Sequence, residues 1–467
     1  MSPRLAAWIL GGLTAIGVAG SVYRIPMQVP DSLEVVERVV PLPSAAAAFR
    51  QGLGNSTLML RPLKEVRTKL LVEAGESLGD RFHLVFRGYH ALAGAVLIAL
   101  VVWVCRVRRW TDVAALACSL AILTGAHTFA GLFRESFPVN HFLLVAIFAV
   151  AAFALSQGRG GRLADTAGIL VFVIATLTFE TGLLVWMVAA AAFAAGARGL
   201  SKRAMLVMTL LLVAYVGLRV GYLSKQPVGY GQRTTGFGAG TITADEQFKR
   251  FSGNPVPFWA YNVSMSAVSV LLSQPTTGQW TVVRAWQQGS VPPVYFVEIG
   301  SSVMTTALVL WYLGGRGPSG RRRWREPLPM AFVVVLGASA ALSYAYAKDE
   351  IVSSAGVFYA LLAYAALRET LTRRPVSWRA VPVALLVVAL GGAWAMRAAG
   401  LHLKLRHAAF DARSDWAFVL YPANRPRWPA DPDTLRIVTR MREESMLQRT
   451  VAPALLPAWT ERWWGDD

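Results

Sequence analysis

The chain has 467 residues, of which 55% are hydrophobic and 16% charged, and its formal net charge is +19. Soluble globular domains carry about 25% charged residues, so this composition, arranged in long apolar runs, excludes that class and predicts an all-α polytopic membrane protein. The positive charge does not indicate a nucleic-acid partner, because the basic residues lie in short runs between hydrophobic segments, as in cytoplasmic loops.

About eleven stretches of the sequence are predicted to span the membrane, since a helix needs about 20 mostly apolar residues to cross a bilayer. They are residues 5–22, 87–105, 112–132, 139–157, 164–179, 181–197, 204–223, 295–313, 327–346, 351–367 and 380–398. The first stretch is longer than the apolar core of about 7–15 residues in signal peptides. It is therefore interpreted as an uncleaved anchor, with a cleaved signal peptide as the alternative.

The distribution of Lys and Arg predicts the orientation of these spans. With the N-terminus taken as cytoplasmic, the inner connections contain the basic stretches CRVRRW, GRGGR, ARGLSKR, GRGPSGRRRWR and LRETLTRRPVSWR. The short outer connections contain only Arg134 and Lys348. This bias follows the positive-inside rule and places the C-terminus on the outer side.

Three longer regions are predicted on the outer side, namely a first outer loop (24–86), a second outer loop (224–294) and a C-terminal tail (399–467). Within the second loop, residues 257–273 are interpreted as a helix that lies at the interface or against the bundle. The stretch DPDTLRIVTRMREESML predicts an amphipathic tail helix capped by Asp433. This helix is expected to pack on the second outer loop or to lie at the membrane surface.

The spans 164–179 and 181–197 are separated only by a possible turn at Phe179, Glu180 and Thr181. A single long tilted helix is the alternative. It is disfavoured because it would place every later basic connection on the outer side.

Ionisable side chains gather at the predicted outer ends of the spans. Such groups cost roughly 2.5–3.5 kcal/mol each at membrane depth, so they usually face the bundle interior or a wet cavity. They are His83, Arg87, His90, His127, Arg134, Glu135, His141, Glu180, Arg219, Lys348, Asp349 and Glu350. The histidines lack the spacing of a transition-metal site, so no metal ligands are assigned.

The first outer loop opens with Asp31, Glu34 and Glu37. If this piece is helical, the three carboxylates share one face, because residues three or four apart are neighbours on a helix. Clustered carboxylates can supply a general base at neutral pH. A solvated amphipathic helix is the alternative.

Several short motifs follow this acidic opening. They are Arg61-Pro62-Leu63, Phe82-His83 before the second span, Tyr89-His90-Ala91 within it, Phe137-Pro138 at an outer turn, and Phe179-Glu180. Together with Asp31 and Glu34 they resemble the GT-C class of polytopic glycosyltransferases, which includes protein mannosyltransferases and lipid A aminoarabinose transferases. The resemblance covers residues 1–200 in pattern and the rest in architecture. The chain departs from the class in three places: the first loop has no Asp-Asp or Glu-Asp dipeptide, the region of His141 replaces an acidic residue, and no Lys precedes Glu180.

The resemblance implies that residues 1–398 form a GT-C-like domain that transfers a sugar at the outer face of a bacterial inner membrane. The donor would be a polyprenyl-phosphate-linked sugar, and the acceptor a glycan, lipid or protein. Asp31 would be the base, with Glu34 as its substitute. The implied substrate-binding residues are Arg87, Arg219 and Lys348 on the phosphate, Arg61 of the motif, and Glu180, His83 and His90 around the cavity. No cofactor is implied, although part of the class uses a divalent metal.

Three other functions are compatible with the sequence. A transporter or flippase would be expected to place ionisable residues near the bilayer midplane. A polysaccharide polymerase or ligase typically has its large outer loop late in the chain. An inactive scaffold would bind a lipid or protein partner through the Trp-rich tail.

Overall fold

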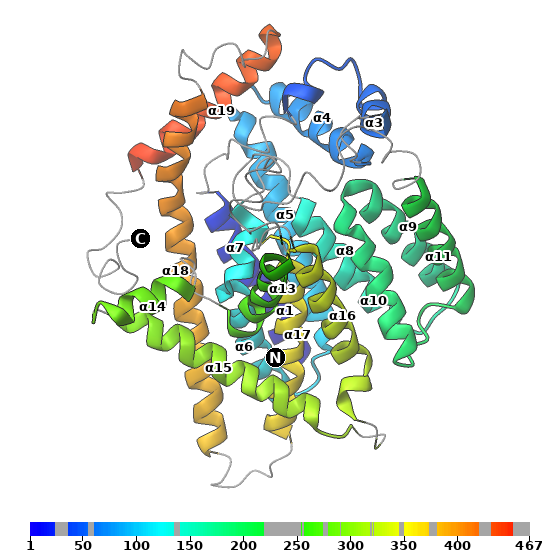
Figure 1. Ribbon diagram of the computed structural model, residues 1–467, viewed down its shortest axis with the longest axis vertical. Coiled ribbons are helices and arrows are strands. Elements are labelled where there is room, and N and C mark those ends of the chain that lie inside the picture. The colour runs from blue at the N-terminus through cyan, green and yellow to red at the C-terminus, as the bar shows by residue number, and fades with distance from the viewer. Residues whose placement is uncertain are drawn as a thin grey trace.

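The computed structural model describes residues 1–23, 36–54, 60–134, 141–218, 254, 256–273, 279–289, 291–317, 320, 322–344, 350–372, 381–419 and 431–451. In these ranges every regular element is a helix, apart from one isolated bridge between Arg316 and Arg322 (Figure 1). The all-α prediction is therefore confirmed for the described part of the chain.

Four helices among the described residues are long and apolar enough to cross a membrane. They are α1 (Pro3–Val22), α5 (Phe82–Cys105), α15 (Pro293–Gly314) and the segment Val381–His402 of α18 (Val381–Val419). Shorter apolar helices are α6 (Trp110–Gly125), α8 (His141–Ser156), α10 (Leu183–Ala194) with η2 (Glu180–Gly182), α13 (Val256–Leu272) and α16 (Pro327–Leu342). The remaining helices are α3 (Ala45–Gly54), α4 (Pro62–Ser77), η1 (Gly79–Arg81), α7 (His127–Arg134), α9 (Arg162–Thr178), α11 (Lys202–Gly217), α14 (Gln279–Gln287), η6 (Arg323–Arg325), α17 (Ser353–Thr372) and α19 (Pro432–Val451). These are the helices of a membrane protein, and the number of crossings stays a prediction.

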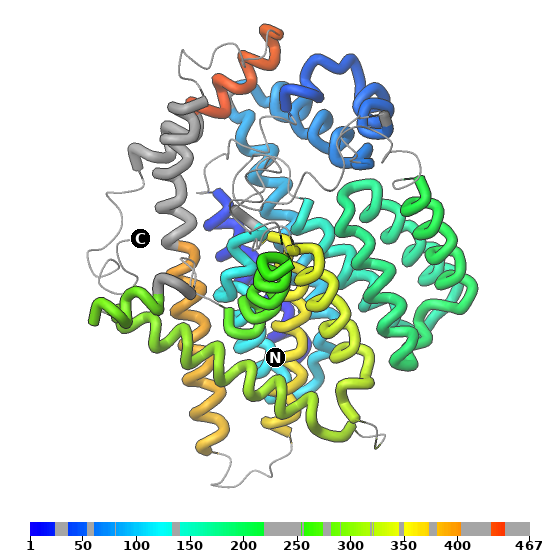
Figure 2. The backbone as a smooth tube through the Cα atoms, viewed as in Figure 1, coloured from blue at the N-terminus to red at the C-terminus, as the bar shows by residue number. Residues whose placement is uncertain are grey.

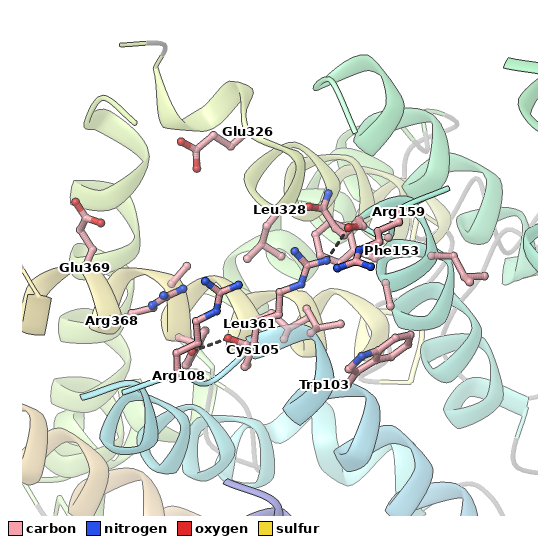
Figure 3. Close-up of a pocket in the computed structure, with 18 of the residues that line it drawn as sticks. Trp103, Cys105, Arg108, Phe153, Arg159, Glu326, Leu328, Leu361, Arg368 and Glu369 are labelled. Atoms are coloured by element: carbon pink, nitrogen blue, oxygen red, sulfur yellow. Dashed lines mark hydrogen bonds between the residues drawn. The ribbon is translucent and has the colours of Figure 1, made fainter. Parts of the chain in front are cut away.

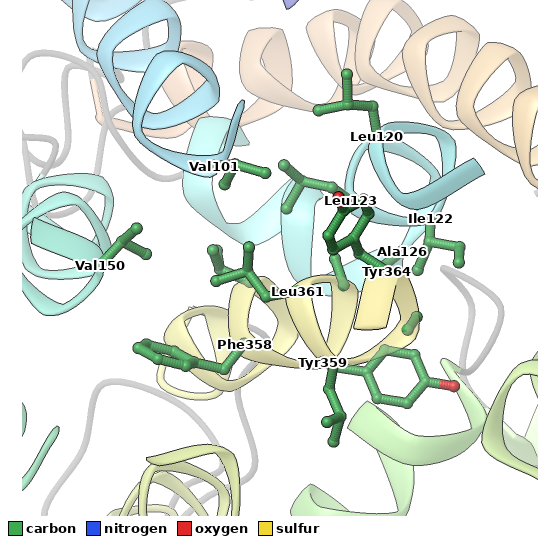
Figure 4. Packing of buried hydrophobic residues seen from close by; sticks show 14 of the residues in the cluster. Val101, Leu120, Ile122, Leu123, Ala126, Val150, Phe358, Tyr359, Leu361 and Tyr364 are labelled. Atoms are coloured by element: carbon green, nitrogen blue, oxygen red, sulfur yellow. The ribbon is translucent and has the colours of Figure 1, made fainter. Parts of the chain in front are cut away.

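Helix α17 forms the centre of the core. Residues 352–364 are all buried, and α17 packs against α6, α8, α15 and α16. Figure 4 shows Phe358, Tyr359 and Leu361 among side chains of the neighbouring helices. A helix that is apolar around its whole circumference is stable only when other elements enclose it, and this explains the position of α17.

The third predicted span, 112–132, is not one continuous helix. Helix α6 ends at Gly125, Ala126 takes an extended conformation (φ −73°, ψ 139°), and α7 begins at His127. Helix α18 passes directly beside this break, since a Cβ atom on Gly125 would lie 2.6 Å from the Trp394 carbonyl oxygen. Helix α18 itself extends beyond the predicted boundary at residue 398.

The predicted turn between the fifth and sixth spans is confirmed. Helix α9 ends at Thr178, Phe179 is extended, and η2 leads into α10. Gly182 allows this turn to close, because a Cβ atom there would lie 2.3 Å from the Ala175 carbonyl oxygen. Helices α9, α10 and α11 then pack side by side (Figure 2). The alternative of one long helix is therefore wrong.

The connections at the two ends of the bundle differ in character. Helices α3, α4 and α19 lie at one end, called here the first-loop end, at the top of Figure 1. The opposite end is called the basic end. It contains the described parts of the five basic connections that the sequence predicts on the cytoplasmic side. Four of them line one cavity, and the fifth joins them where the Gly199 amide donates to the Ser156 carbonyl at 2.9 Å. Which membrane face each end meets stays a prediction.

The tail helix α19 packs on the first loop. Ile437, Val438 and Met441 form a buried cluster with residues of the 36–40 segment, α4 and α5, and Arg436 pairs with Glu76 at 2.7 Å. Among the described residues this contact takes the place of the expected packing on the second outer loop.

The predicted cap of α19 also needs correction. The backbone amide and hydroxyl of Thr434 both donate to the carboxylate of Asp431, at 2.8 and 2.7 Å. These hydrogen bonds lower the pKa of Asp431. The N-cap is therefore Asp431 and not Asp433, because an N-cap carboxylate accepts from the amide three residues later.

We expect Asp112→Asn to destabilise the basic end. The Asp112 side chain is fully buried and accepts hydrogen bonds from the Arg108 and Arg109 amides and from Arg368 Nε, at 2.8, 3.0 and 2.9 Å. Asparagine has an NH₂ donor in place of one carboxylate oxygen, so at least one of these N–H groups would lose its acceptor. The expected loss is about 1–3 kcal/mol of unfolding free energy. A lower melting temperature in detergent micelles would show it. Asp433→Asn, at an exposed position, is the control, and equal melting of both variants would contradict the prediction.

Candidate functional site at the first-loop end

Helix α4 of the first loop packs against both α5 and α9. Its sequence favours a helix start at Pro62, since proline suits the first helical position and Glu65 lies in the first turn. The preceding Leu60 is buried against Tyr215 of α11. The first loop is therefore anchored to the helix bundle.

The segment 36–40 of the first loop is fixed on α4 by two polar contacts. Arg38 Nη2 lies 3.0 Å from Glu65 Oε1, and Lys69 Nζ donates to the Val40 carbonyl at 3.0 Å. Glu65 and Lys69 are both buried, which is unusual for charged residues unless they are paired. Val36, at the start of this segment, is buried against α4, α5 and α19. The chain that directly follows Asp31 and Glu34 is thus held on the bundle.

Arg61 and Glu180 form a two-bond ion pair between the first loop and the turn that follows α9. Arg61 Nε and Nη2 donate to Glu180 Oε2 and Oε1 at 2.7 and 2.6 Å, and the two side chains are 12% and 15% exposed. The guanidinium also lies over the Phe179 ring, with 4.1 Å from Cζ to the centroid. Because both oxygens of Glu180 accept from Arg61, this carboxylate acts as a positioning group and not as a free base.

His141 extends this cluster. Its ring centroid lies 4.0 Å from that of Phe179, and the imidazole is buried. The Phe179 ring therefore contacts both the Arg61 guanidinium and the His141 imidazole. The sequence motifs around Arg61 and Glu180 thus come together in space, although 119 positions separate them.

His83, Arg87 and His90 lie on one face of α5, because their spacing of four and three residues repeats with the helical turn. Arg87 Nη1 donates to the Val22 carbonyl at 2.8 Å and lies over the Tyr23 ring. The last carbonyls of a helix lack partners within it, so a cation at this place stabilises the end of α1. His90 is 2% exposed and lies one turn deeper.

Arg67 lies beside Arg87 and His90 of α5, and it was not predicted as a site residue from the sequence. It projects from α4 over the Tyr89 ring, with 5.9 Å from Cζ to the centroid, and interacts electrostatically with His90, as Arg87 does. Its three guanidinium nitrogens are buried, and among the described residues none has a hydrogen-bond partner. Burying a charge without a partner is costly, and a planar guanidinium matches phosphate or carboxylate oxygens. We name Arg67 and Arg87 the cationic cluster, and His90 lies beside both arginines.

The sequence contains one signal for Arg67, which is the second arginine in RPLKEVR, six positions after Arg61. Six residues of α-helix span about 9 Å. Arg61, at the start of α4, therefore reaches the turn after α9, while Arg67 reaches α5. Sequence reasoning could not separate Arg67 from the other charges of this helix, because only packing decides which of them is buried.

The structure relates the predicted site residues to one another only in part. It joins Arg61 to Glu180, and it places Arg87 and His90 together with Arg67. Four predicted site residues, namely Asp31, Glu34, Arg219 and Lys348, lie outside the described residues. The expected convergence of Asp31, Arg219 and Glu180 on one cavity therefore stays a prediction. Within the described ranges, no group of three or more His, Cys, Asp or Glu side chains is placed to hold a metal ion.

Comparison with known protein families, with curated proteins and with solved structures gives no match for this chain.

Proposed function

We propose that the protein is a GT-C-like glycosyltransferase that moves a sugar from a polyprenyl-phosphate donor to an acceptor at the membrane surface. The observation that carries the proposal is the cationic cluster beneath α4. Arg67 lies in the loop that opens with Asp31 and Glu34. Its guanidinium is buried and has no hydrogen-bond partner among the described residues. Cationic groups stabilise a departing phosphate, and a carboxylate can take the proton of the acceptor hydroxyl.

In the proposed reaction the acceptor hydroxyl attacks the anomeric carbon of the donor sugar. The carboxylate of Asp31 takes the hydroxyl proton as the new C–O bond forms. The bond between the anomeric carbon and the phosphate oxygen breaks, and its electron pair leaves on that oxygen. Arg67 and Arg87 stabilise the charge of the departing phosphate, because charge-assisted hydrogen bonds are stronger than neutral ones.

The Arg61–Glu180 pair supports this arrangement without touching the reacting atoms. It holds the N-terminal end of α4 on the bundle, and this fixes the direction from which Arg67 approaches α5. Ordered placement of catalytic groups accounts for a large share of enzymatic rate acceleration.

The test is transfer of labelled sugar from a polyprenyl-phosphate sugar pool in membranes that contain the full-length protein. Wild type should transfer label, and Asp31→Asn should lower the rate about 100-fold, since a general base contributes 10²–10⁴-fold. Full activity in Asp31→Asn would overturn the assignment of the base. Absence of transfer with every donor would overturn the proposed function.

One observation favours transport as the second candidate. Arg397 in α18 is 4% exposed and donates to Ser301 and Ser302 hydroxyls and to the Glu298 and Ser273 carbonyls. Buried ionisable residues within predicted spans often mark ion or substrate paths. Uptake of labelled lipid-linked sugar into vesicles, without transfer to an acceptor, would favour this candidate.

A further inference from the structure

A cavity of about 1010 Å³ lies at the basic end, opposite to the end of the bundle that holds the candidate site. Its walls come from the α5–α6 and α8–α9 connections, from the connection between α15 and α16, and from the end of α17. Six arginines line it, against two glutamates. The lining arginines are Arg106, Arg108, Arg109, Arg159, Arg323 and Arg368. This surplus of positive charge indicates an anionic ligand.

Three of the arginines are occupied by contacts within the protein. Arg106 donates to the Gln157 carbonyl at 2.6 Å, Arg323 pairs with Glu369 at 2.8 Å, and Arg368 pairs with Asp112 at 2.9 Å. These contacts fix the connections relative to one another. Arg323 also lies 3.6 Å from Glu326, so both glutamates of the lining are paired with it and do not cancel the charge of the remaining arginines.

Of the three other arginines, Arg109 is exposed and directly follows Arg108 in the chain. Arg108 and Arg159 come from two different connections and remain available to a ligand. Both side chains are exposed, and among the described residues neither has a side-chain hydrogen bond or ion pair. Figure 3 shows them on different walls of the cavity, with Glu326 and Glu369 away from Arg159 on the other side. Two guanidinium groups from separate loops can bind the oxygens of one phosphate.

The other part of the wall is apolar. Trp103 of α5 and Leu163, Ala164 and Ala167 of α9 line it, and Trp103 and Leu163 are 54% and 88% exposed. Both helices are apolar, and α5 is long enough to cross a membrane. The cavity therefore joins a cationic part to an apolar surface, which matches an amphiphile better than a free anion. Tryptophan is typical of the membrane interface.

We propose that this cavity binds an anionic phospholipid, with its phosphate between Arg108 and Arg159 and its acyl chains along Trp103 and the α9 face. Basic pockets between helices suit such headgroups. The site is independent of the proposed transferase reaction and lies at the other end of the bundle. Its role is to hold one lipid against the α5–α9 side of the protein.

The test uses the full-length protein in a neutral detergent, with phosphatidylglycerol, phosphatidylcholine and inorganic phosphate as separate additions. Native mass spectrometry measures bound lipid, and the melting temperature is followed in parallel. Wild type should bind phosphatidylglycerol in preference to phosphatidylcholine. The double variant Arg108→Gln/Arg159→Gln should bind it about 30-fold more weakly, given the effect of each basic residue near an anionic lipid.

The matched control removes the same charge at the same end. Lys202 and Arg203 begin α11, are exposed and do not line the cavity, so Lys202→Gln/Arg203→Gln should leave lipid binding unchanged. An equal loss of lipid binding in both double variants would show that general surface charge attracts the lipid, and this would overturn the proposal. An equal rise in melting temperature with inorganic phosphate would indicate a free-anion site and overturn the lipid assignment.

A third variant keeps every charge. Ala167→Trp adds bulk to the apolar wall and should weaken phosphatidylglycerol binding while the arginines remain. If the double arginine variant does not fold, this variant still decides the question, because unchanged lipid binding in Ala167→Trp would contradict the placement of the acyl chains.

Discussion

Replacing Arg67 with glutamine should lower the rate of sugar transfer about 100-fold, and Arg67→Glu about 1,000-fold, because removing one donor to a developing anion costs 10²–10³ in rate. The buried guanidinium lies beside Arg87 and His90 on one side of α4. Arg67→Lys should retain part of the rate, since it keeps the charge but loses the planar two-bond geometry. The measurement is the initial rate of label transfer at saturating acceptor.

The stability of these variants separates a functional role from a structural one. Arg67 has three buried nitrogens without a hydrogen-bond partner among the described residues. Removing a buried charge that has no hydrogen-bond partner relieves its desolvation cost, so Arg67→Gln should melt at the wild-type temperature or above it. A lower melting temperature with unchanged transfer would show that Arg67 stabilises the fold and takes no part in the reaction. Arg50→Gln is the matched control, because Arg50 is an exposed arginine of α3 at the same end.

Glu180→Ala should remove about 3 kcal/mol from the free energy of unfolding, since breaking a buried ion pair leaves one charge uncompensated. The pair is nearly buried, with side chains 12% and 15% exposed, so solvent screening weakens it little. Arg61 would lose both acceptors, and the N-terminal end of α4 would lose its main polar contact with the α9–α10 turn. Denaturant titration in detergent micelles measures the change, and faster proteolysis within the first loop should accompany it.

Two comparisons make this result specific. Glu76→Ala breaks two other ion pairs between separate helices, with Arg436 and Arg440, but the three side chains are 28%, 48% and 33% exposed. It should therefore cost less than about 1 kcal/mol. The exchange Arg61→Glu with Glu180→Arg should recover part of the stability that either single substitution loses. If Glu180→Ala costs no more than Glu76→Ala, the pair does not anchor the first loop.

The sequence by itself determined that this protein is helical and built for a membrane. Long apolar runs such as Phe82–Cys105 bury their backbone polar groups within their own helix, so composition alone is a sufficient signal. It also predicted that the basic connections belong together, and the structure gathers them at one end. The turn at Phe179 followed from the short gap between two apolar runs, because only two helices allow the later charges to alternate.

Only the tertiary structure decided which charged side chains are buried and which residues they pair with. The break at Ala126 lies where α18 comes close to Gly125, and the sequence LTGAHTF does not reveal this neighbour. The pairing of Arg61 with Glu180 and the burial of Arg67 beside α5 are likewise contacts between groups whose partners are set by packing. The cap at Asp431 is different, because its partner Thr434 is only three residues away in the chain. Hydrophobic patterns report how strongly a segment avoids water, whereas the partner of a charged side chain depends on which helix lies within a few ångströms of it. For this reason the sequence was sufficient to predict a membrane protein, whereas the cationic cluster could be identified only from the folded structure.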